Sequence, residues 1–387
     1  MDRAGLEVHG GDCRLGRWTG GNANGSSRAA SGSSRRGTRR ATRRPSTARW
    51  PSGQGRSSTS TVSARASGGS KPAWPGCSRR RLPSSFRAAR WRSRSPCGSG
   101  ARAGSSTVAF HPRCHLDVHE ERGYEHLHGL HGRPVGHRDR MLERADLDRI
   151  IEPVGALLLE LPQRDLGGQL PAWRELRSQA AWARANGVAL HLDGARLWQC
   201  GPFYRRPLSE ISALFDTVYV SLYKDLGALG GCVLAGPEHV IAEARVWRIR
   251  HGGRLSTFDP MALSAERGLD EVLPRMPSFV RKARQIGAAL ARVDGVTLVP
   301  DPPQVAMLHV AVRGELERLD DALLEIAKER RTLIAGGFEP TALPNVQRTE
   351  LGIGAPSLEV PTREIAELYA QLVSRAAKPP RRARRRA

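Results

Sequence analysis

Residues 155–192 constrain the fold more than any other stretch of this 387-residue chain. The stretch begins and ends with short, mostly apolar runs, residues 155–161 and 188–192, which are typical of strands buried on both faces of a parallel sheet. Between them, residues 171–186 have apolar side chains at helical spacing, and Gly187 follows as the expected cap of the helix C-terminus. A strand, a crossover helix and a second strand predict a parallel sheet and therefore an α/β fold.

Charged residues follow two of the predicted strands. Asp193 comes just after residues 188–192, and Lys224 ends a second apolar run at residues 215–223. Cys232–Ala235 is a third strand-like run beyond a glycine-rich turn. In an open α/β sheet the groups at the carboxyl ends of the strands line the ligand crevice. We therefore expect Asp193 and Lys224 to belong to one site.

This pair of residue types suits a particular chemistry. A lysine at the end of a buried strand can lose its proton through desolvation and become an amine nucleophile. A carboxylate on the neighbouring strand can keep a pyridinium nitrogen protonated, which makes pyridoxal 5'-phosphate (PLP) an electron sink. Alone, Asp193 is an ordinary turn residue and Lys224 an ordinary strand end; together, 31 residues apart with glycine-rich turns after each, they favour the chemistry.

The two motifs around these residues are specific when they occur in order. HLDGAR at residues 191–196 and SLYKDLGALGG at residues 221–231 resemble the threonine aldolase/β-eliminating lyase family of fold-type-I PLP enzymes. The resemblance covers about residues 107–376. It implies an α/β large domain with a mostly parallel sheet at residues 107–258. It also implies an interdomain helix and a small α+β domain at residues 259–377.

The resemblance assigns roles to residues of both motifs. Lys224 is expected to carry the internal aldimine, and Asp193 to pair with the pyridine nitrogen. Arg196 is expected to hold the substrate carboxylate or the phenolic edge of the cofactor, and Ser221 to be among the cofactor-binding residues. Asp225 stands where the family has glycine, which adds a charge beside Lys224.

Three further residues resemble family positions. His115, with Glu120 five residues later, resembles the histidine that stacks on the PLP ring, where it could also move a proton. Gln163 stands where the family has a histidine near the substrate hydroxyl; we expect it to bind substrate, but glutamine cannot titrate. Arg348 resembles the arginine that grips the substrate α-carboxylate, because its planar fork matches a carboxylate; an ordinary strand-edge arginine is the alternative.

Histidine is frequent between residues 111 and 131, and His-rich tracts can bind metal ions. His115 and His119 have the spacing of a pair on one helix face, but no third ligand follows at a known spacing. We therefore expect no metal site here. For the other histidines we expect a surface helix with solvated side chains.

The chain is basic only at its two ends. Its net charge is +23, yet residues 1–110 hold 22 Lys and Arg against three acidic residues, whereas residues 111–377 hold 33 against 35. The tail, residues 378–387, holds six basic residues. A basic nucleic-acid-binding arm and an organellar transit segment both fit residues 1–106. We do not expect nucleic acid as a partner, because the predicted domains are nearly neutral.

A disrupted reading frame explains residues 1–106 best. Off-frame reading of GC-rich codons yields Arg, Ala, Gly, Pro and Ser with few acids, and no Asp or Glu occurs from Cys13 to Leu116. Shifted by one frame, residues 69–100 permit a helix, a strand and a glycine-containing turn into a second helix, a phosphate-cradling pattern. The family's S-G-T turn binds the PLP phosphate there, whereas this chain reads RAAR at residues 87–90.

The second half of the chain predicts helices and the strands of a small domain. The helices are expected at residues 237–250, 260–293, Leu316–Arg330 and 362–376, and the strands at residues 297–299, 307–312, 333–334 and 347–353. The basic segment 239–254 resembles one that lies at a subunit interface in the family, so we expect a homodimer or homotetramer. A solvated basic face is the alternative.

Together these features predict a PLP-dependent lyase that cleaves the Cα–Cβ bond of a β-hydroxy-α-amino acid through Lys224. β-Elimination or racemisation is the alternative within PLP chemistry, and a pseudo-enzyme or a basic nucleic-acid-binding protein is the alternative outside it. Six cysteines without metal-ligand spacing favour the reducing cytoplasm. No apolar run approaches the roughly 20 residues of a membrane span, so no membrane association is expected.

Overall fold

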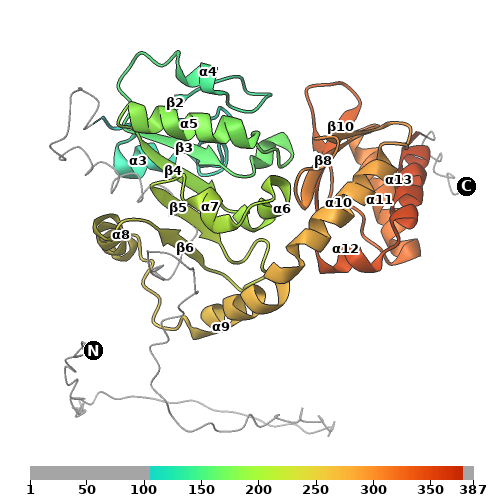
Figure 1. The fold of residues 1–387 in the computed structure, drawn as a ribbon. Helices are drawn as coiled ribbons and strands as arrows, with labels where there is room; N and C mark the ends of the chain where they lie inside the picture. Colours follow the sequence, from blue (N-terminus) through green and yellow to red (C-terminus); the bar gives the residue numbers. More distant parts are fainter. Residues whose placement is uncertain (1–104, 378–387) are drawn as a thin grey trace, which may run out of the picture. The chain divides into compact units, whose positions relative to one another are not determined.

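The computed structural model describes residues 105–377 (Figure 1). Its strands are β1 (Thr107–Phe110), β2 (His131–Pro134), β3 (Ala156–Glu160), β4 (Ala189–Gly194), β5 (Thr217–Ser221), β6 (Cys232–Ala235), β7 (Val296–Val299), β8 (Met307–Arg313), β9 (Glu339–Pro340) and β10 (Val346–Gly352). Its helices are α2 (His115–Val118), α3 (Gly123–His128), α4 (Arg144–Leu147), α5 (Trp173–Ala185), α6 (Gly201–Tyr204), α7 (Leu208–Ser212), α8 (Glu238–Arg250), α9 (Asp259–Arg267), α10 (Met276–Leu290), α11 (Leu316–Arg330), α12 (Ala355–Glu359) and α13 (Thr362–Ala377). The expectations for residues 1–104 and for the basic tail concern residues outside this part of the chain.

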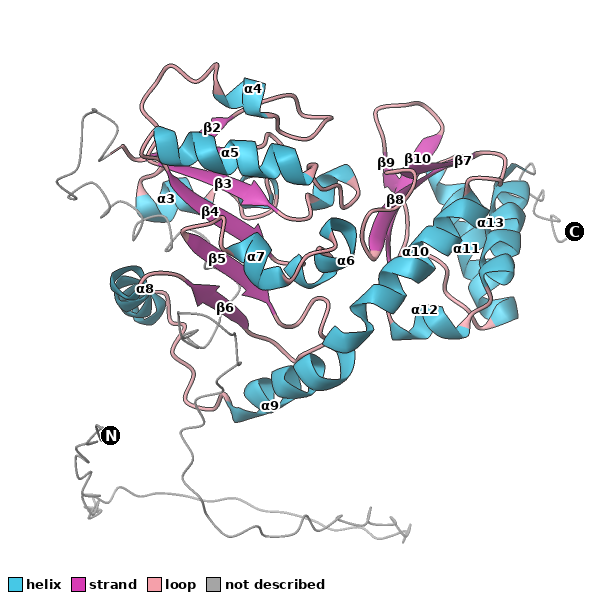
Figure 2. Cartoon of the chain, viewed as in Figure 1, coloured by secondary structure: helices cyan, strands magenta, loops and turns pink. Residues whose placement is uncertain are grey.

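Within the described residues, β1 to β6 form one sheet, here called the large sheet, in the order β2-β1-β3-β4-β5-β6 (Figure 2). The pairs among β1 to β5 are parallel, and β6 is antiparallel to β5. The prediction of an α/β fold with a mostly parallel sheet is confirmed. Parallel strands all end at the same edge, so the loops that follow β1, β3, β4 and β5 meet there.

The interior strands of the large sheet are apolar because both of their faces are covered. All five residues of β3 and all six of β4 are buried. α5, which connects β3 to β4 in the sequence, crosses one face of the sheet (Figure 1). It buries a stripe of side chains at helical spacing that includes Leu176, Ala180 and Ala183. Gly187, with φ +64°, then turns the chain into β4 in the left-handed region that glycine allows.

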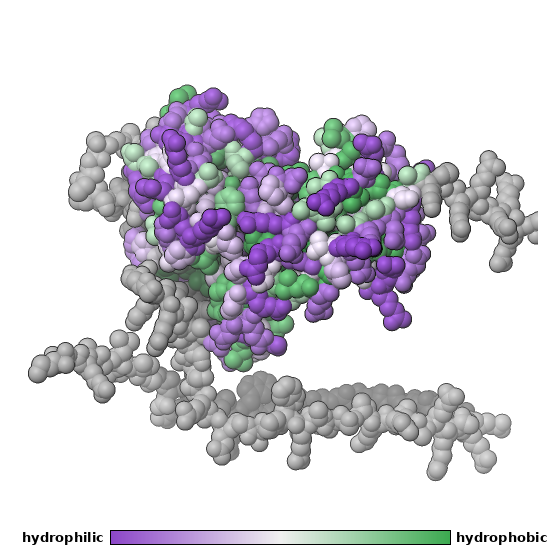
Figure 3. All heavy atoms as spheres, turned by 45° about the vertical axis from the view of Figure 1, so that its right-hand side comes forward, coloured by the Kyte–Doolittle hydropathy of each residue, from purple (hydrophilic) through white to green (hydrophobic). Residues whose placement is uncertain are grey.

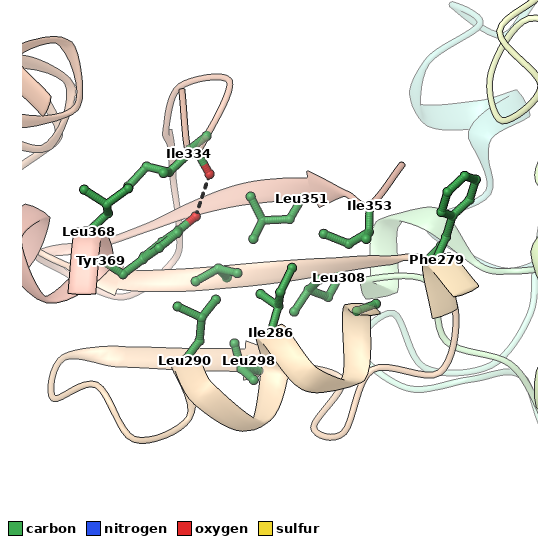
Figure 4. Close-up of a cluster of buried hydrophobic side chains, with 14 of the residues drawn as sticks. Phe279, Ile286, Leu290, Leu298, Leu308, Ile334, Leu351, Ile353, Leu368 and Tyr369 are labelled. Atoms are coloured by element: carbon green, nitrogen blue, oxygen red, sulfur yellow. Dashed lines mark hydrogen bonds between the residues drawn. The ribbon is translucent and has the colours of Figure 1, made fainter. Parts of the chain in front are cut away.

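β7 to β10 form a second, antiparallel sheet, here called the small sheet, in the order β7-β8-β10-β9. Residues on α10 and α13 pack against it in one apolar cluster (Figure 4). Residues of α11, among them Leu319 and Leu323, belong to the same cluster. The Tyr369 hydroxyl on α13 donates a hydrogen bond of 3.1 Å to the Ile334 carbonyl inside this cluster. Along β10 buried and half-buried residues alternate, as expected for a strand with one covered face.

Two predictions in the second half of the chain are wrong. Residues 260–293 are not one helix: a π-helical turn and a 3₁₀ turn separate α9 from α10. Pro274 lies in this break and lacks the amide hydrogen that a continuous α-helix needs. Residues 333–334 are not a strand, and β9 pairs with β10 instead. Ile334 is buried but Leu333 is exposed, in an irregular segment between α11 and Gly336-Gly337.

The described surface is largely hydrophilic on the face shown in Figure 3, with smaller apolar patches between the polar side chains. None of the helices in residues 105–377 is long and apolar enough to cross a membrane.

Gly167, in the loop after β3, lies directly against the small sheet. Its φ is +75°, and a Cβ atom there would collide with the Val299 carbonyl oxygen. Gly187 has a similar φ of +64° but open space around it. Gly187→Ala should therefore lose about 1 kcal/mol of unfolding free energy, the cost of a left-handed alanine. Gly167→Ala should lose about 1–3 kcal/mol more, because the packing must also shift. Urea unfolding of both variants measures this difference, and equal losses would contradict the contact.

Candidate active site

Four ionisable side chains stand where parallel strands of the large sheet end. His115 begins α2 just after β1, and Glu160 is the last residue of β3. Asp193 lies near the end of β4, and Lys224 follows β5 by three residues. The strand order β1-β3-β4-β5 makes these positions neighbours along one sheet edge. The structure thus brings Asp193 and Lys224 to adjacent strand ends.

Asp193 and Glu160 form a pair of buried carboxyl groups. They are register partners on β3 and β4, and 1% and 8% of their surfaces are exposed. Burial raises the pKa of Asp193, and the charges of Lys224 and His115 oppose this in part. Burial and the Asp193 charge raise the pKa of Glu160 to about 7. One proton is therefore readily held between these groups near neutral pH.

The Glu160 carboxylate is held in place by its neighbours. Its Oε2 accepts hydrogen bonds from the backbone amide of His115 at 3.2 Å and from Nε2 of Gln163 at 3.1 Å. Its Oε1 accepts from the backbone amide of Arg164 at 3.0 Å. These donors join the loops after β1 and β3, so Glu160 ties two strand ends together.

Lys224 is half-buried, and its environment favours the neutral amine. Burial lowers the pKa of Lys224 most, and the charge of Arg196 lowers it further. The charges of Asp193 and Glu160 act in the opposite direction without outweighing these effects. A lysine with a lowered pKa is the form that attacks carbonyl carbon.

Arg196 and Arg164 converge on one carboxylate from the small sheet. Arg164 Nε donates to Glu350 Oε2 at 2.7 Å, and Arg196 Nη2 donates to Glu350 Oε1 at 3.3 Å. Nε2 of His309 lies 3.7 Å from Glu350 Oε2. The candidate site therefore includes groups from β10 and β8 as well as from the large sheet.

His115 lies beside other titratable groups. Its Nε2 is 3.4 Å from Glu120 Oε1, and its ring centroid is 4.9 Å from that of His119. His119 in turn contacts Asp165 at 2.9 Å. In residues 105–377 no group of three or more His, Cys, Asp and Glu side chains is arranged to hold a metal ion.

Three of the predicted site residues have other partners in this structure. Ser221 is fully buried, and its hydroxyl donates to the Ala195 carbonyl at 2.7 Å. Gln163 is buried too, and besides Glu160 its amide donates to the Arg113 carbonyl at 2.8 Å. Arg348 on β10 donates to Glu339 Oε2 at 2.9 Å, and no contact joins it to the lysine or the aspartate.

Asp225, the departure from the family motif, is accommodated beside Lys224. Gln199 Nε2 donates to its Oδ1 at 2.7 Å. Burial raises the pKa of Asp225 to about 6, and the charge of Arg196 and the Gln199 hydrogen bond oppose the rise. At neutral pH the side chain is therefore mostly ionised, and its charge counters that of Arg196.

Sequence reasoning missed three members of this cluster: Glu160, Arg164 and Glu350. A signal existed for Glu160, because it is the one charged residue in an otherwise apolar strand. Glu350 had no comparable signal, since a charged residue in an alternating strand usually faces water. Its contact with Arg164 joins residues 186 positions apart.

Comparison with known proteins identifies the family. Residues 101–313, more than half of the chain, match the family described as beta-eliminating lyase. The chain belongs to this family. Enzymes of the family use pyridoxal 5'-phosphate, so the resemblance noted for the HLDGAR and lysine motifs is confirmed at the level of family and cofactor.

Several curated relatives of the chain are aldolases. It is 27% identical over 243 residues to low-specificity L-threonine aldolase 1 of Arabidopsis thaliana, covering 60% of this chain and 66% of the relative. It is 37% identical over 158 residues to aldolase vrtJ of Penicillium aethiopicum, covering 38% of this chain and 39% of that protein. The chain thus spans less than two thirds of these relatives.

Solved structures share the fold over a longer range. A structure assigned as an L-allo-threonine aldolase from Listeria monocytogenes is 31% identical, with a TM-score of 0.71, covering 79% of this chain and 82% of that one. Threonine aldolase of Leishmania major, at 17% identity and a TM-score of 0.55, shares the fold. These structures confirm the predicted fold-type-I architecture.

The side chains at the sheet edge fit the ring end of PLP by their chemistry. A pyridine nitrogen needs a buried acid, which Asp193 provides, and an aldehyde needs an amine of lowered pKa, which Lys224 provides. The segment that corresponds to the family's phosphate-binding turn lies outside the described residues.

Arg196 should control the protonation of Lys224. In Arg196→Gln the guanidinium charge is removed and Glu350 loses one partner, and both changes favour the ammonium form. The pKa of Lys224 should therefore rise, and labelling of its amine by an acylating reagent should shift to higher pH. Mass spectrometry of the cofactor-free protein measures the profile. Arg348→Gln is the matched control and should leave it unchanged; an unshifted profile in Arg196→Gln would contradict the electrostatic link.

Proposed function

We propose that this protein is a PLP-dependent lyase that cleaves the Cα–Cβ bond of a β-hydroxy-α-amino acid. The observation that carries the proposal is the pairing of a buried acid, Asp193, with a half-buried lysine of lowered pKa, Lys224, at adjacent strand ends. Family membership and the aldolases among the similar proteins support the same reaction class. The Asp193–Lys224 pair gives no support to the alternative of a nucleic-acid-binding protein.

The side chains of the site have separate tasks in this proposal. Bound PLP supplies the electron sink for the electrons released when the Cα–Cβ bond breaks. Lys224 and Asp193 would hold the cofactor, and Asp193 would keep a proton at its pyridine nitrogen. His115 would lie against the ring face and could take the proton of the substrate hydroxyl. Glu160, whose pKa is raised to about 7, would hold a proton near neutral pH and so would not add a second full negative charge beside Asp193.

The substrate carboxylate needs a cationic partner, and Arg196 and Arg348 are the proposed pair. Arg196 is close enough to shift the pKa of Lys224, which supports a place at the reacting end. Arg348 lies on the same strand as Glu350, two residues away and therefore on the same face. In this role it would exchange Glu339 for the substrate.

Gln163 supports a second candidate reaction. It is buried, cannot titrate, and donates its amide hydrogens to Arg113 and Glu160. It therefore cannot remove a proton from a substrate hydroxyl, which favours β-elimination or racemisation if His115 does not perform this step. The products separate the reactions, since aldol cleavage gives glycine and an aldehyde, and elimination from serine gives pyruvate and ammonia.

Lys224→Ala should abolish turnover, because no other residue can replace the covalent attachment. With PLP added, the wild-type protein should form glycine and acetaldehyde from threonine or allo-threonine, and the variant should be slower on the order of 10³-fold or more. Lys328→Ala, on the exposed side of α11, is the matched control and should keep wild-type activity. A folded wild-type protein that yields no glycine from either substrate would contradict the proposed reaction.

We also propose that the protein works as a homodimer or homotetramer in the cytoplasm. Val246 and Ile249, three residues apart on α8, are 46% and 54% exposed, and contiguous exposed apolar side chains are typical of interaction surfaces. Leu255 and Leu263, farther along the chain, are also exposed.

Sedimentation equilibrium tests the assembly. The wild-type mass should be two or four times that of one chain, and Ile249→Asp should shift it toward the monomer, because a charge would be buried in the interface. Leu324→Asp is the matched control, since Leu324 is also 54% exposed but lies on α11. A monomeric wild-type protein would contradict the proposal.

A further inference from the structure

Glu350 is the point where the small sheet meets the cationic groups of the site. Its carboxylate is bound on one side by Arg164 at 2.7 Å and on the other by Arg196 at 3.3 Å. His309, on the adjacent strand β8 and directly opposite in register, approaches to 3.7 Å. The side chain of Glu350 is 28% exposed, so this cluster is partly shielded from water.

Glu350 stays ionised over the pH range in which enzymes usually work. Burial raises the pKa of its carboxyl group, but the His309 hydrogen bond and the charges of Arg196 and Arg164 outweigh burial and lower the pKa to about 2. Glu350 is therefore a permanent internal anion. It occupies guanidinium donors that would otherwise attract an anionic ligand.

The two arginines act directly on the reacting end of the site. The charges of both Arg196 and Arg164 lower the pKa of Lys224, so both guanidinium groups lie within electrostatic range of its amine. Arg164 has one further acidic neighbour, Asp165 at 3.7 Å, but Asp165 is held more closely by His119 at 2.9 Å. Glu350 is thus the acid that joins the two arginines, and its removal would leave the site one unit more positive.

This arrangement bears on substrate choice, and the inference rests on the proposed function. We propose that Glu350 makes the site selective for amino acids with an uncharged side chain, because it neutralises one of the two guanidinium charges beside Lys224. The site then retains enough positive charge for the α-carboxylate of the substrate. A second carboxylate on the substrate side chain would be repelled by the Glu350 carboxylate, and this repulsion would weaken binding.

A carboxylate–arginine pair outside the site supplies a matched comparison. Glu329 on α11 accepts from Arg375 on α13 at 2.6 Å, much as Glu350 accepts from Arg164. Glu329 is, however, 56% exposed, and neither it nor Arg375 is among the groups that shift the pKa of Lys224. Neutralising Glu329 removes a carboxylate–arginine pair of the same type without changing the charge beside the lysine.

Binding to the full-length cofactor-free chain tests the inference independently of catalysis. Calorimetry would compare succinate, a dicarboxylate, with butyrate, a monocarboxylate of the same length. Glu350→Gln should tighten succinate binding relative to butyrate by at least ~10-fold, the ratio that corresponds to about 1.4 kcal/mol. Glu329→Gln should change the ratio less than ~2-fold. An unchanged ratio in a folded Glu350→Gln protein would overturn the proposal.

A double variant distinguishes lost charge from lost structure. Arg164→Gln combined with Glu350→Gln removes one charge of each sign and should restore the wild-type preference for butyrate over succinate. If the double variant keeps the altered ratio of the single variant, Glu350 acts through packing and the charge argument is wrong. Far-UV circular dichroism confirms that each variant is folded.

The PLP-loaded protein supplies the catalytic readout. Glu350→Gln should raise the ratio of kcat/KM for 3-hydroxyaspartate to that for allo-threonine by at least ~10-fold, mainly through a lower KM for the acidic substrate. If the wild-type protein cleaves neither substrate, the proposed function fails, and the calorimetric ratio still decides the role of Glu350. If both substrates are cleaved and the ratio does not move, the specificity proposal fails alone.

Discussion

The site depends on the electrostatic interaction between the buried Asp193 carboxylate and the half-buried Lys224 amine. Neither group would be stable in its useful form on a protein surface, because water would restore the ordinary pKa values of both. Burial pushes Asp193 toward the acid and Lys224 toward the free amine, and the charge of each opposes the shift of the other. The two groups therefore stand at adjacent strand ends, Asp193 with a raised pKa and Lys224 with a lowered one.

The fold provides this balance through the parallel sheet. β3, β4 and β5 lie side by side with their carboxyl ends at one edge, so three loops deliver charged groups to the same place. The apolar strands exclude water from the base of the site, and the backbone amides around Glu160 keep a second carboxylate in register with Asp193. The small sheet adds Glu350, which binds the arginines from the opposite side.

The sequence predicts those features that depend on local pattern. β6 and α11 begin and end where the pattern of apolar residues places them, and the positions of Asp193 and Lys224 beside strand ends follow from runs of apolar residues. The grouping of Arg164, Arg196 and Glu350 could not be predicted, because it joins segments more than 150 residues apart through side-chain contacts. The break between α9 and α10 could not be predicted from the apolar pattern, because the helical spacing of apolar residues continues through Pro274.

Covalent trapping of the cofactor tests the central claim most directly. The protein would be incubated with PLP and reduced with borohydride, which fixes the cofactor to the lysine that holds it, and the labelled peptide would be found by mass spectrometry. The account predicts label on Lys224, with retention reduced in Asp193→Asn because the pyridine nitrogen loses its acid partner. Label confined to another lysine, or equal labelling of Lys224 with and without the Asp193 carboxylate, would contradict it.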